Sequence, residues 1–591
     1  MSHAVEMIFR TNPEQEPGFY RFGGFEGEIS AYEEAEVVPA LLKIEAAVNA
    51  GYYVVGFLSY EAAAALDRSL TVKMPSSFPL VWFGVFRERH LQSAQEFPET
   101  ANQVCYEMSG WQSAISREEY RQAIEKIKAY IGAGDCYQVN YTLQQHSSFR
   151  GDVQSFFHDL YRAQATPYSA FFDLDQYCIL STSPELFFQL DQGVMTVRPM
   201  KGTACRGKSS HEDQEIAALL KRDEKELAEN LMIVDLLRND LGRISENGSV
   251  TVKSLFDVET LETVHQMTST ISSRLRSDVG LVDIFRALFP CGSITGAPKK
   301  RSMEIIAEME DIPRGLYTGC IGYISPEMRQ AVFSVAIRTV IIEKDSGTGT
   351  LGVGSGITWY SSPDAEFEEC LAKGIFAQKA QPDFKLIESL LFEKGSGYFL
   401  LEKHIDRLEC SARYFGFQFD LESVRTSLEE YSQAISESSK VRLLLSRDGS
   451  FTVEVDLLVA STSCPTSWIT FADQAVDSSN RFLYHKTSNR EMYRFELEKK
   501  PDCVDVIFCN EKGEITEGAN NTIVIRKDGI LLTPPVNCGL LPGTLRAQLL
   551  ETGEVTEGVI MPADVEQADE IYLINSVRKW RRASLFRGAL R

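Results

Sequence analysis

A lysine stands in a stretch where the sequence predicts a tight turn. Arg198-Pro-Met-Lys-Gly-Thr203 follows the apolar residues 194–197, and its proline and glycine are turn-forming residues. If Lys201 lies in a closed, partly apolar pocket, desolvation lowers its pKa and makes the neutral amine a nucleophile at physiological pH. A lone lysine in a polar turn is more often an exposed surface residue, so the neighbouring motifs must decide between the two interpretations.

A carboxylate precedes this lysine along the chain. Glu185 follows Pro184, beyond the hydrophobic run 177–180. A glutamate in such a place is commonly the outward side chain of an edge strand. In a closed pocket with Lys201, burial would instead raise its pKa and suit it to general acid and base catalysis. The two residues together could therefore supply a nucleophile and an acid.

Further carboxylates lie on two predicted helices. Glu229 begins a predicted helix over residues 229–240, where it could simply be a surface residue that complements the helix dipole. A second predicted helix, over residues 364–378, contains Glu366 and Glu369. Mg²⁺ favours about two carboxylates together with water and a substrate oxygen. Glutamates from both helices could therefore hold this metal ion.

These motifs occur in one order over residues 115–378. In their wording and spacing they resemble the chorismate-utilising enzymes, the family of anthranilate synthase component I, isochorismate synthase and aminodeoxychorismate synthase component I. Within that family, anthranilate and isochorismate synthases typically have alanine in place of the lysine, whereas aminodeoxychorismate synthases have Pro-Ile-Lys-Gly-Thr. Pro199-Met-Lys-Gly-Thr203 keeps the lysine. The resemblance therefore favours aminodeoxychorismate synthase activity.

The resemblance implies roles for the residues of this half. Lys201 would attack the substrate ring, and Glu185 would protonate the departing C4 hydroxyl. Glu229 and Glu369 would hold Mg²⁺, with Glu366 assisting through water, and the metal would bind the ring carboxylate of chorismate.

The same resemblance assigns substrate-binding positions. His265 would be a polar group near the ring hydroxyl, and Tyr317 and Arg338 would contact the pyruvyl carboxylate, for which a forked guanidinium is suited. The stretch 352–357, Gly-Val-Gly-Ser-Gly-Ile, is interpreted as a turn whose backbone amides approach a carboxylate. The remaining positions carried over from the family are Thr295, Gly356 and Lys373.

A different set of motifs begins after residue 384. They resemble fold-type IV pyridoxal phosphate enzymes, specifically aminodeoxychorismate lyase, over nearly all of residues 384–582. The stretches that carry this resemblance are 386–391, 401–408, 411–417, 484–490, 514–521 and 539–546. Any one of them has an ordinary structural interpretation, but their order and spacing favour the family.

The second resemblance implies a cofactor site. Lys486 would bind pyridoxal phosphate covalently and later carry a proton. Glu517 would face the pyridine nitrogen and keep it protonated, which makes the ring an electron sink. The residues implied to hold the phosphate are Arg407, Thr544, Leu545 and Ser576. Amino-acid transaminases share these residues, so the choice of substrate stays open.

The composition of the whole chain restricts its class. Its 591 residues are 44% hydrophobic and 24% charged, which is typical of globular proteins. A formal charge of −23 argues against a nucleic-acid partner, which needs an excess of lysine and arginine. The twelve cysteines include no Cys-x-x-Cys pair. No apolar run approaches the roughly 20 residues of a membrane helix. We therefore expect a cytoplasmic protein without a membrane partner.

The motifs divide the chain into four segments. Residues 1–112 would flank the synthase domain, 113–378 would form its chorismate-binding part, 379–384 a linker, and 385–591 the pyridoxal phosphate-dependent domain. We expect mixed α and β structure. The first half would be a two-layer antiparallel β-sandwich flanked by helices, and the second half would be a fold-type IV fold of two subdomains.

Together the two resemblances imply a bifunctional enzyme. It would convert chorismate and ammonia to 4-amino-4-deoxychorismate, and then eliminate pyruvate to give 4-aminobenzoate for folate synthesis. A separate glutamine amidotransferase subunit would supply the ammonia, and a homodimer through the lyase domain is a further expectation. Three alternatives stay open: an anthranilate or isochorismate synthase in the first half, a branched-chain or D-amino-acid type transaminase in the second, and a non-catalytic binding subunit.

Overall fold

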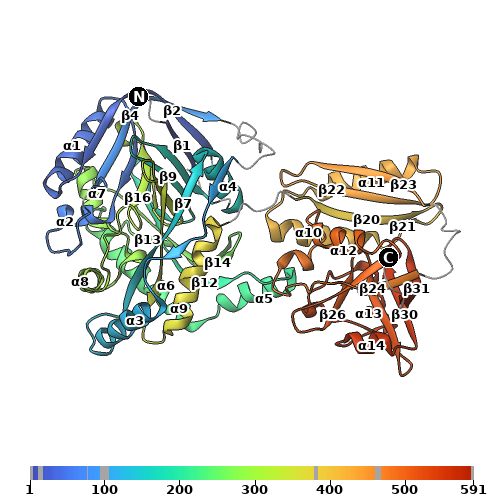
Figure 1. Ribbon diagram of the computed structural model, residues 1–591. Helices are drawn as coiled ribbons and strands as arrows, with labels where there is room; N and C mark the ends of the chain where they lie inside the picture. The colour runs from blue at the N-terminus through green and yellow to red at the C-terminus, as the bar shows by residue number, and fades with distance from the viewer. Residues whose placement is uncertain are drawn as a thin grey trace. The chain divides into compact units, whose positions relative to one another are not determined.

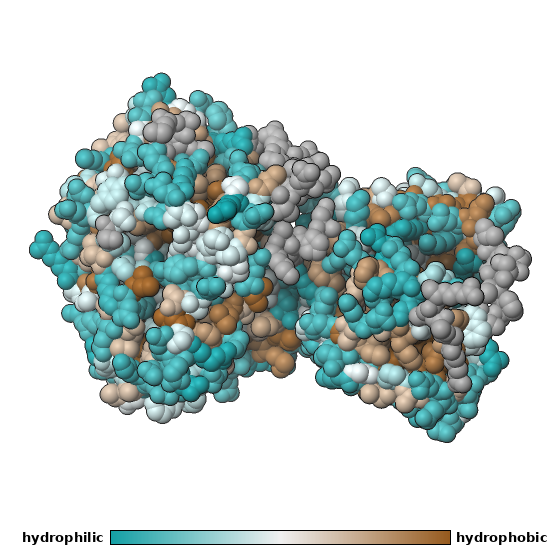
Figure 2. All heavy atoms as spheres, viewed as in Figure 1, coloured by the Kyte–Doolittle hydropathy of each residue, from teal (hydrophilic) through white to brown (hydrophobic). Residues whose placement is uncertain are grey.

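The chain forms two compact units. The computed structural model describes residues 4–10, 18–75, 77–92, 105–164, 166–378, 384–458 and 467–586. One unit comprises Met1–Cys205 and Ala217–Gln381, and the other comprises Arg206–Ile216 and Pro382–Arg591 (Figure 1). Most of the predicted linker and of the polar stretch 92–105 lies outside the described residues. In Figure 2, hydrophilic residues cover much of the visible face of each unit.

A 19-stranded antiparallel sheet organises the first unit. Its pairings form one continuous path, whose members in order are β7 (Gln138–Gly151), β19 (Thr348–Ile357), β18 (Thr339–Glu343), β9 (Tyr177–Ser183), β8 (Tyr168–Asp173), β1 (Ala4–Phe9), β2 (Gly18–Ala31), β4 (Val81–Gln92), β3 (Tyr53–Leu58), β16 (Cys320–Ile324), β17 (Gln330–Val335), β10 (Leu186–Asp191), β11 (Val194–Arg198) and β14 (Val264–Arg274). Both β12 (Met200–Cys205) and β13 (Thr251–Thr260) pair with β14. The path therefore ends in β19 and β7 on one side and in β14 and β12 on the other.

Helices cover this sheet and confirm the mixed architecture expected for the first half. They are α1 (Glu34–Asn49), α2 (Ala63–Leu66), α3 (Arg117–Gly132), α4 (Val153–Gln164), α6 (Glu224–Gly242), α7 (Leu281–Leu288), α8 (Lys299–Met309) and α9 (Pro363–Gly374). Helix α5 (Ser210–Leu220) is divided between the two units, because its residues up to Ile216 belong to the second. Helix α3 begins with a capping box, since the Ser116 hydroxyl accepts from the Glu119 amide and the Glu119 carboxylate accepts from the Ser116 amide. Its apolar residues Tyr120, Ile124 and Ile127 are buried.

Three helix boundaries differ from expectation. Helix α6 begins at Glu224, because the Asp223 side chain accepts from two free amides at its start and caps it. Glu229 therefore lies in the second turn rather than at the beginning. Pro298 precedes α8 as its cap residue, not as its first helical residue. Helix α9 ends at Gly374 and is followed by a short 3₁₀ turn, Ile375–Ala377.

Two predicted turns are strands. Lys201 lies in β12, where the pairing with β14 shifts register between Met200 and Thr203, and Gly202 takes a φ of +100°. The glycine-rich stretch 352–357 belongs to β19, which pairs in continuous register with β7. Glycine serves there to make space rather than to turn the chain, as described below.

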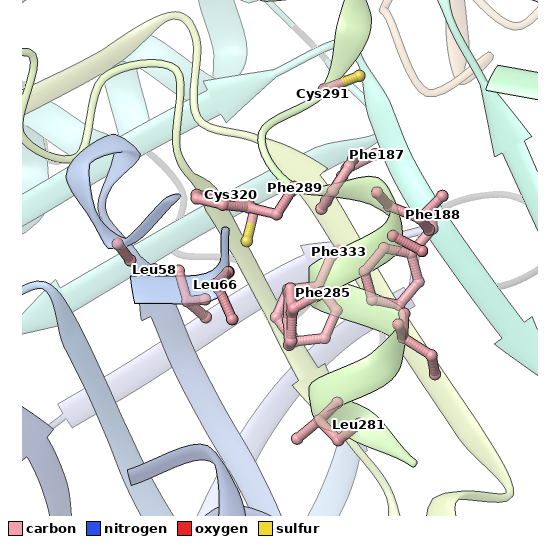
Figure 3. Close-up of a cluster of buried hydrophobic side chains, with 14 of the residues drawn as sticks. Leu58, Leu66, Phe187, Phe188, Leu281, Phe285, Phe289, Cys291, Cys320 and Phe333 are labelled. Carbon is pink, nitrogen blue, oxygen red and sulfur yellow. The ribbon is translucent and has the colours of Figure 1, made fainter. Parts of the chain in front are cut away.

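An aromatic cluster anchors the strand that follows Glu185 (Figure 3). Phe187 and Phe188 of β10 pack with Phe285 of α7, with Phe289 just after that helix, and with Phe333 of β17. The ring centroids of Phe188 and Phe333 are 5.0 Å apart, and those of Phe285 and Phe333 are 5.4 Å apart. Contacts between buried rings fix β10 firmly. The start of this strand, where Glu185 stands, is therefore held in place.

The second unit consists of two sheets with separate cores. Four strands form the first sheet, in the order β21 (Gly397–Tyr398), β20 (Leu386–Glu393), β22 (Ser439–Leu445) and β23 (Phe451–Leu457). Eight form the second, in the order β26 (Ile515–Gly518), β25 (Asp505–Cys509), β24 (Ser467–Phe471), β31 (Lys579–Leu585), β30 (Glu570–Asn575), β27 (Thr522–Lys527), β28 (Ile530–Thr533) and β29 (Thr556–Glu557). The helices are α10 (Leu401–Phe415), α11 (Leu421–Ala434), α12 (Glu491–Glu498), α13 (Thr544–Glu551) and α14 (Pro562–Glu566). Nowhere in the described part of the chain is a helix both long and apolar enough to cross a membrane.

Candidate active sites

A cavity of about 190 Å³ in the first unit collects most of the residues predicted for chorismate chemistry. The predicted residues that line it are Glu185, Lys201, Glu229, Tyr317, Arg338, Gly356, Glu366, Glu369 and Lys373. They come from distant parts of the sequence and are brought together because β12 and β19, at the two ends of the strand path, face each other. A Cβ atom at Gly356 would lie 2.9 Å from Lys201 Nζ.

Lys201 and Glu185 have the electrostatics of a nucleophile and an acid. Burial lowers the pKa of Lys201, opposed chiefly by the nearby Glu229 carboxylate. Burial raises the pKa of Glu185 to about 7, although hydrogen bonds from Ser293 and Met200 favour its carboxylate. The Ser293 hydroxyl donates to Glu185 Oε1 at 2.5 Å. Both shifts favour the uncharged forms, a neutral amine on Lys201 and a protonated carboxyl on Glu185, in the same cavity.

Buried polar contacts hold the backbone of Lys201. The Asn230 side-chain amide donates to the Lys201 carbonyl at 3.0 Å, and the Ser269 hydroxyl donates to Asn230 Oδ1 at 2.6 Å. The Gln266 side chain donates to the Gly202 carbonyl at 2.9 Å. Helix α6 and strand β14 thus fix the bulged strand that carries the lysine.

Four carboxylates line one side of this cavity. Glu226 and Glu229 come from α6, and Glu366 and Glu369 come from α9. The Gln138 side chain donates to Glu229 Oε2 at 3.0 Å, whereas the buried Glu229 Oε1 has no hydrogen-bond partner among the described residues. Glu226 was not among the predicted residues. It lies three residues before Glu229, and this spacing places both side chains on the same face of α6.

These carboxylates fit a hydrated hard cation. Over the described ranges, no group of three or more histidine, cysteine, aspartate and glutamate side chains is arranged to hold a metal. Mg²⁺ is usually held by only one or two carboxylates and keeps several waters, so it does not need a complete protein cage. The observation that fits such an ion best is Glu229 Oε1, which accepts no hydrogen bond among the described residues and has Lys225 Nζ at 3.8 Å. Glu369 is partly occupied by Lys373, whose Nζ lies 2.6 Å from it.

Tyr317 and Arg338 form another wall of the cavity. Burial lowers the pKa of Arg338 to about 10, which leaves the guanidinium charged at neutral pH. Its Nη1 donates to Gln164 Oε1 at 2.8 Å. A Cβ atom at Gly352 would lie 2.2 Å from the Tyr317 ring. Glycine in β19 therefore lets the tyrosine ring lie against the strand.

Two predicted residues are not part of the cavity lining. Val264 and Gln266 of β14 face the cavity, so the intervening His265 faces the other side of the strand. Its Nδ1 lies 3.2 Å from the Thr260 hydroxyl. Thr295 is fully buried, and its hydroxyl lies 3.3 Å from the Cys291 and Gly292 carbonyls.

Ser293, two residues before Thr295, and Gln266, next to His265, line the cavity where the two predicted residues do not. The roles of His265 and Thr295 near the substrate stay predictions.

A second cavity, of about 430 Å³, lies in the other unit. All six residues predicted to hold pyridoxal phosphate line it, namely Arg407, Lys486, Glu517, Thr544, Leu545 and Ser576. Burial lowers the pKa of Lys486 to about 7, assisted by the positive charges of Arg490 and Arg407. A substantial fraction of this amine is therefore neutral at physiological pH, as covalent attachment to an aldehyde requires.

Glu517 lies in the same cavity and is hydrogen-bonded on both oxygens. Burial raises its pKa to about 7. The Tyr493 hydroxyl donates to Oε1 at 2.8 Å, and the Leu541 amide donates to Oε2 at 3.4 Å. A carboxylate so fixed is suited to face a ring nitrogen that carries a proton.

An anion cradle occupies one side of this second cavity. Helix α13 begins there, with Gly543 as its cap residue and Thr544 as its first residue, so its free amides and helix dipole favour a negative charge. Arg407 lies beside it. The sequence analysis missed Glu388, which accepts two hydrogen bonds from Arg407. Its signal was a single carboxylate within the apolar strand 386–391.

Comparison with known proteins agrees with these two sites. Residues 9–379 match the family described as chorismate binding enzyme, and residues 385–586 match amino-transferase class IV. Aminodeoxychorismate synthase component 1 of Klebsiella aerogenes is 44% identical over 265 residues, which cover 45% of this chain and 58% of that protein. Anthranilate synthase component 1 of Aquifex aeolicus is 36% identical over 275 residues, which cover 46% of this chain and 55% of that protein.

The chain therefore spans somewhat more than half the length of these curated relatives. A solved structure of anthranilate synthase component I from Streptococcus pneumoniae superposes with a TM-score of 0.52 and 23% sequence identity, covering 63% of this chain and 92% of that one. The first unit thus has the fold of anthranilate synthase component I.

Proposed function

We propose that this chain, which belongs to the family of chorismate binding enzymes, makes 4-aminobenzoate from chorismate in two successive reactions. The first unit replaces the C4 hydroxyl of chorismate with ammonia to give 4-amino-4-deoxychorismate. The second unit eliminates pyruvate from that compound. The observation that carries the proposal is the presence of Lys201 and Glu185 in one cavity, with a lowered pKa for the amine and a raised pKa for the carboxyl.

In the first reaction, Lys201 Nζ forms a bond to ring C2. The ring double bond shifts, and the C4–O bond breaks as Glu185 gives its proton to the hydroxyl oxygen, so that water leaves. Ammonia then forms a bond to C4, the double bond shifts back, and the C2–N bond to Lys201 breaks. Glu185 recovers a proton from the incoming ammonia. The sequence identity to aminodeoxychorismate synthase component 1 supports addition of ammonia at C4 over addition of ammonia at C2.

Charge in this cavity is matched to a dianionic substrate. Glu229 and Glu369, with Glu366 through water, would hold Mg²⁺, which neutralises the ring carboxylate when bound. Arg338 and Tyr317 line the cavity, and we propose that the charged guanidinium and the tyrosine hydroxyl bind the pyruvyl carboxylate. Lys373 donates to the Gly354 carbonyl at 2.9 Å and so holds α9 against β19.

The second cavity is proposed to bind pyridoxal phosphate, which supplies an electron sink for the substrate's C4 carbon. Lys486 would hold the cofactor through its neutral amine and would take the proton from C4 of the substrate. Glu517 would lie toward the pyridine nitrogen. Arg407 and the amides of Thr544 and Leu545 would hold the phosphate, with the Ser576 hydroxyl as a further donor. Loss of pyruvate makes the ring aromatic, which drives this step.

A separate subunit is proposed to supply ammonia. The similarity is to proteins named as component 1 of aminodeoxychorismate synthase, and the two units account for residues 9–379 and 385–586. We propose a glutamine amidotransferase as that subunit. Dimerisation through the second unit and a cytoplasmic location stay predictions.

A transaminase is the second candidate for the C-terminal unit, because its residues match amino-transferase class IV. The two functions differ in what they consume. The full chain, loaded with pyridoxal phosphate, is given 4-amino-4-deoxychorismate without any 2-oxo acid, and pyruvate is assayed with lactate dehydrogenase. Stoichiometric pyruvate and 4-aminobenzoate support the lyase, whereas turnover that requires a 2-oxo acid and releases no pyruvate supports the transaminase.

A further inference from the structure

Glu388 is a buried carboxylate in the second unit for which the proposed reaction gives no role. It lies in β20 between Ile387 and Ser389 and is 2% exposed. Its Oε1 accepts from Arg407 Nε at 2.9 Å, and its Oε2 accepts from Arg407 Nη2 at 2.8 Å and lies 2.6 Å from His404 Nδ1. Burial alone would raise the pKa of Glu388, but Arg407 and His404 lower it to about 2. The residue is therefore a fixed negative charge.

This carboxylate determines which face of Arg407 is left for a ligand. It occupies the side of the guanidinium formed by Nε and Nη2. Nη1 donates one hydrogen bond to the Pro542 carbonyl at 3.2 Å. Since a guanidinium has five N–H groups, one at Nη1 and one at Nη2 are left at its end. Arg407 lines the cavity, so this end is suited to two oxygens of an anion.

Glu388 also reaches the start of helix α13 through His404. The histidine is completely buried, and its Nδ1 carries the proton that Glu388 accepts. Its Nε2 lies 3.3 Å from the Thr544 hydroxyl. Thr544 is the first residue of α13 and lines the cavity. One carboxylate thus orders an arginine from α10 and a hydroxyl at the beginning of α13.

We propose that Glu388 is the positioning residue of an anion subsite, holding Arg407 directly and Thr544 through His404 in the arrangement that receives the phosphate of pyridoxal phosphate. The inference rests on the proposed function of the second cavity. Its physical basis is preorganisation: an arginine already fixed by a bidentate ion pair loses little conformational freedom when the anion binds. Without the carboxylate, the side chain must be ordered at the time of binding.

The test compares two glutamate-to-glutamine variants of the full chain. Glu388→Gln keeps the shape but removes the charge. Glu402→Gln is the matched control, because Glu402 lies on the same helix as Arg407 and pairs with Arg425 at 3.0 Å on the exposed surface. Dissociation constants are measured by absorbance for pyridoxal phosphate and for pyridoxal, which lacks the phosphate. Loss of a charged hydrogen-bond partner predicts roughly 10- to 100-fold weaker binding of pyridoxal phosphate by Glu388→Gln.

A positioning role requires that this loss be confined to the phosphorylated ligand, with pyridoxal affinity unchanged and Glu402→Gln like the wild type. Equal weakening of both ligands, or none, would overturn the inference. Failure of the wild-type chain to bind pyridoxal phosphate at all would instead overturn the proposed function of the cavity. If Glu388→Gln does not fold, His404→Gln carries the test. It removes the link to Thr544 alone, and it should weaken pyridoxal phosphate binding several-fold while sparing pyridoxal; unchanged binding would contradict the inference.

Discussion

The two lysines proposed to react are desolvated in the same way, but each has a different carboxyl partner. Burial lowers the pKa of both Lys201 and Lys486, and it raises the pKa of Glu185 and Glu517. In the proposed first reaction Glu185 protonates a hydroxyl, so its acid form is the useful one. Glu517 would meet a protonated ring nitrogen, and that positive charge favours its carboxylate form.

The proton on Glu185 predicts the pH dependence of the first reaction. Its pKa is raised to about 7, so the acid form persists up to about neutral pH and is lost above it. We expect kcat/KM for chorismate to fall as pH rises through about 7, when the concentration of free ammonia is held constant. Glu185→Gln should remove this descending limb together with most of the activity. A rate that increases steadily through neutral pH would contradict the role of Glu185 as the acid.

The fixed charge on Glu388 predicts an acid dependence of stability. Its pKa in the folded state is about 2 against an ordinary value of 4.5, so its stabilisation is present above pH 4.5 and is lost as pH falls toward 2. The difference in unfolding free energy between wild type and Glu388→Gln should therefore be largest at pH 6 and smaller at pH 3. Urea unfolding at the two pH values, followed by circular dichroism, measures it. A difference that grows toward pH 3 would contradict the ion pair.

At the scale of elements, β19 shows how a strand can make room for a site. Gly356 lies where a Cβ atom would be 2.5 Å from Gln138 Nε2 and 2.9 Å from Lys201 Nζ. Gly349, in the same strand, would place its Cβ at 3.4 Å from Trp111, which is ordinary contact. A glycine-to-alanine substitution should therefore disturb the site at position 356 and be tolerated at position 349.

We expect Gly356→Ala to lower kcat/KM of the first reaction by at least about 100-fold, as misplacement of a reacting group does. Gly349→Ala should keep wild-type activity. Both variants should retain the second reaction, assayed with 4-amino-4-deoxychorismate, because the second unit is untouched. If Gly356→Ala is fully active, the methyl group does not meet Lys201, and the geometry of the cavity described here is wrong.

Sequence patterns predicted the elements with strong local signals. The capping box at Ser116 and the apolar stripe of α3 are local properties, and the structure has both. Helix α6 begins earlier than predicted. The prediction took Glu229 as its first residue, whereas the Asp223 side chain caps the helix. The glycines of β19 were interpreted as a turn, since a sequence does not reveal that Tyr317 and Lys201 approach them from elsewhere.

The candidate sites were predictable to a similar degree. Nine residues that the family motifs predicted line the first cavity, and six line the second. The motif could not show that His265 lies outside the cavity lining, because a motif does not fix which face of its strand a residue occupies. Glu388 was overlooked because its partners Arg407 and His404 are on a helix, and only the packing of α10 on β20 brings them together.

At the scale of the whole molecule, the proposed function makes the product of the first cavity the substrate of the second. The linkage of both units in one chain raises the local concentration of that intermediate. Lys201→Ala and Lys486→Ala each disable one cavity. A mixture of the two variants should form 4-aminobenzoate after a lag, while neither does so alone, because the intermediate can diffuse through solution.

Continuous chromatography of the mixture measures the lag, and a mixture of Lys201→Ala with the double variant serves as the blank. If the mixture stays inactive while each variant keeps its remaining half-reaction, free diffusion of the intermediate is excluded.

The charge of the second cavity is opposite to the overall charge of the chain. The net charge is −23, whereas the cavity is lined by one carboxylate, by Lys486 and by six further basic residues, namely Arg407, Lys440, Arg442, Arg490, Arg546 and Arg578. Such a cavity focuses a positive field on dianions while the rest of the surface keeps the protein soluble.

The identity of the aromatic product is the most direct test of the central claim. The purified chain is incubated with chorismate, Mg²⁺, ammonium and pyridoxal phosphate, and the product is identified by mass spectrometry and fluorescence. We predict 4-aminobenzoate and pyruvate, both abolished in Lys201→Ala, with 4-amino-4-deoxychorismate accumulating in Lys486→Ala. Anthranilate or salicylate as the product would contradict the assignment of Lys201, since ammonia or water rather than the lysine would then have been added at C2.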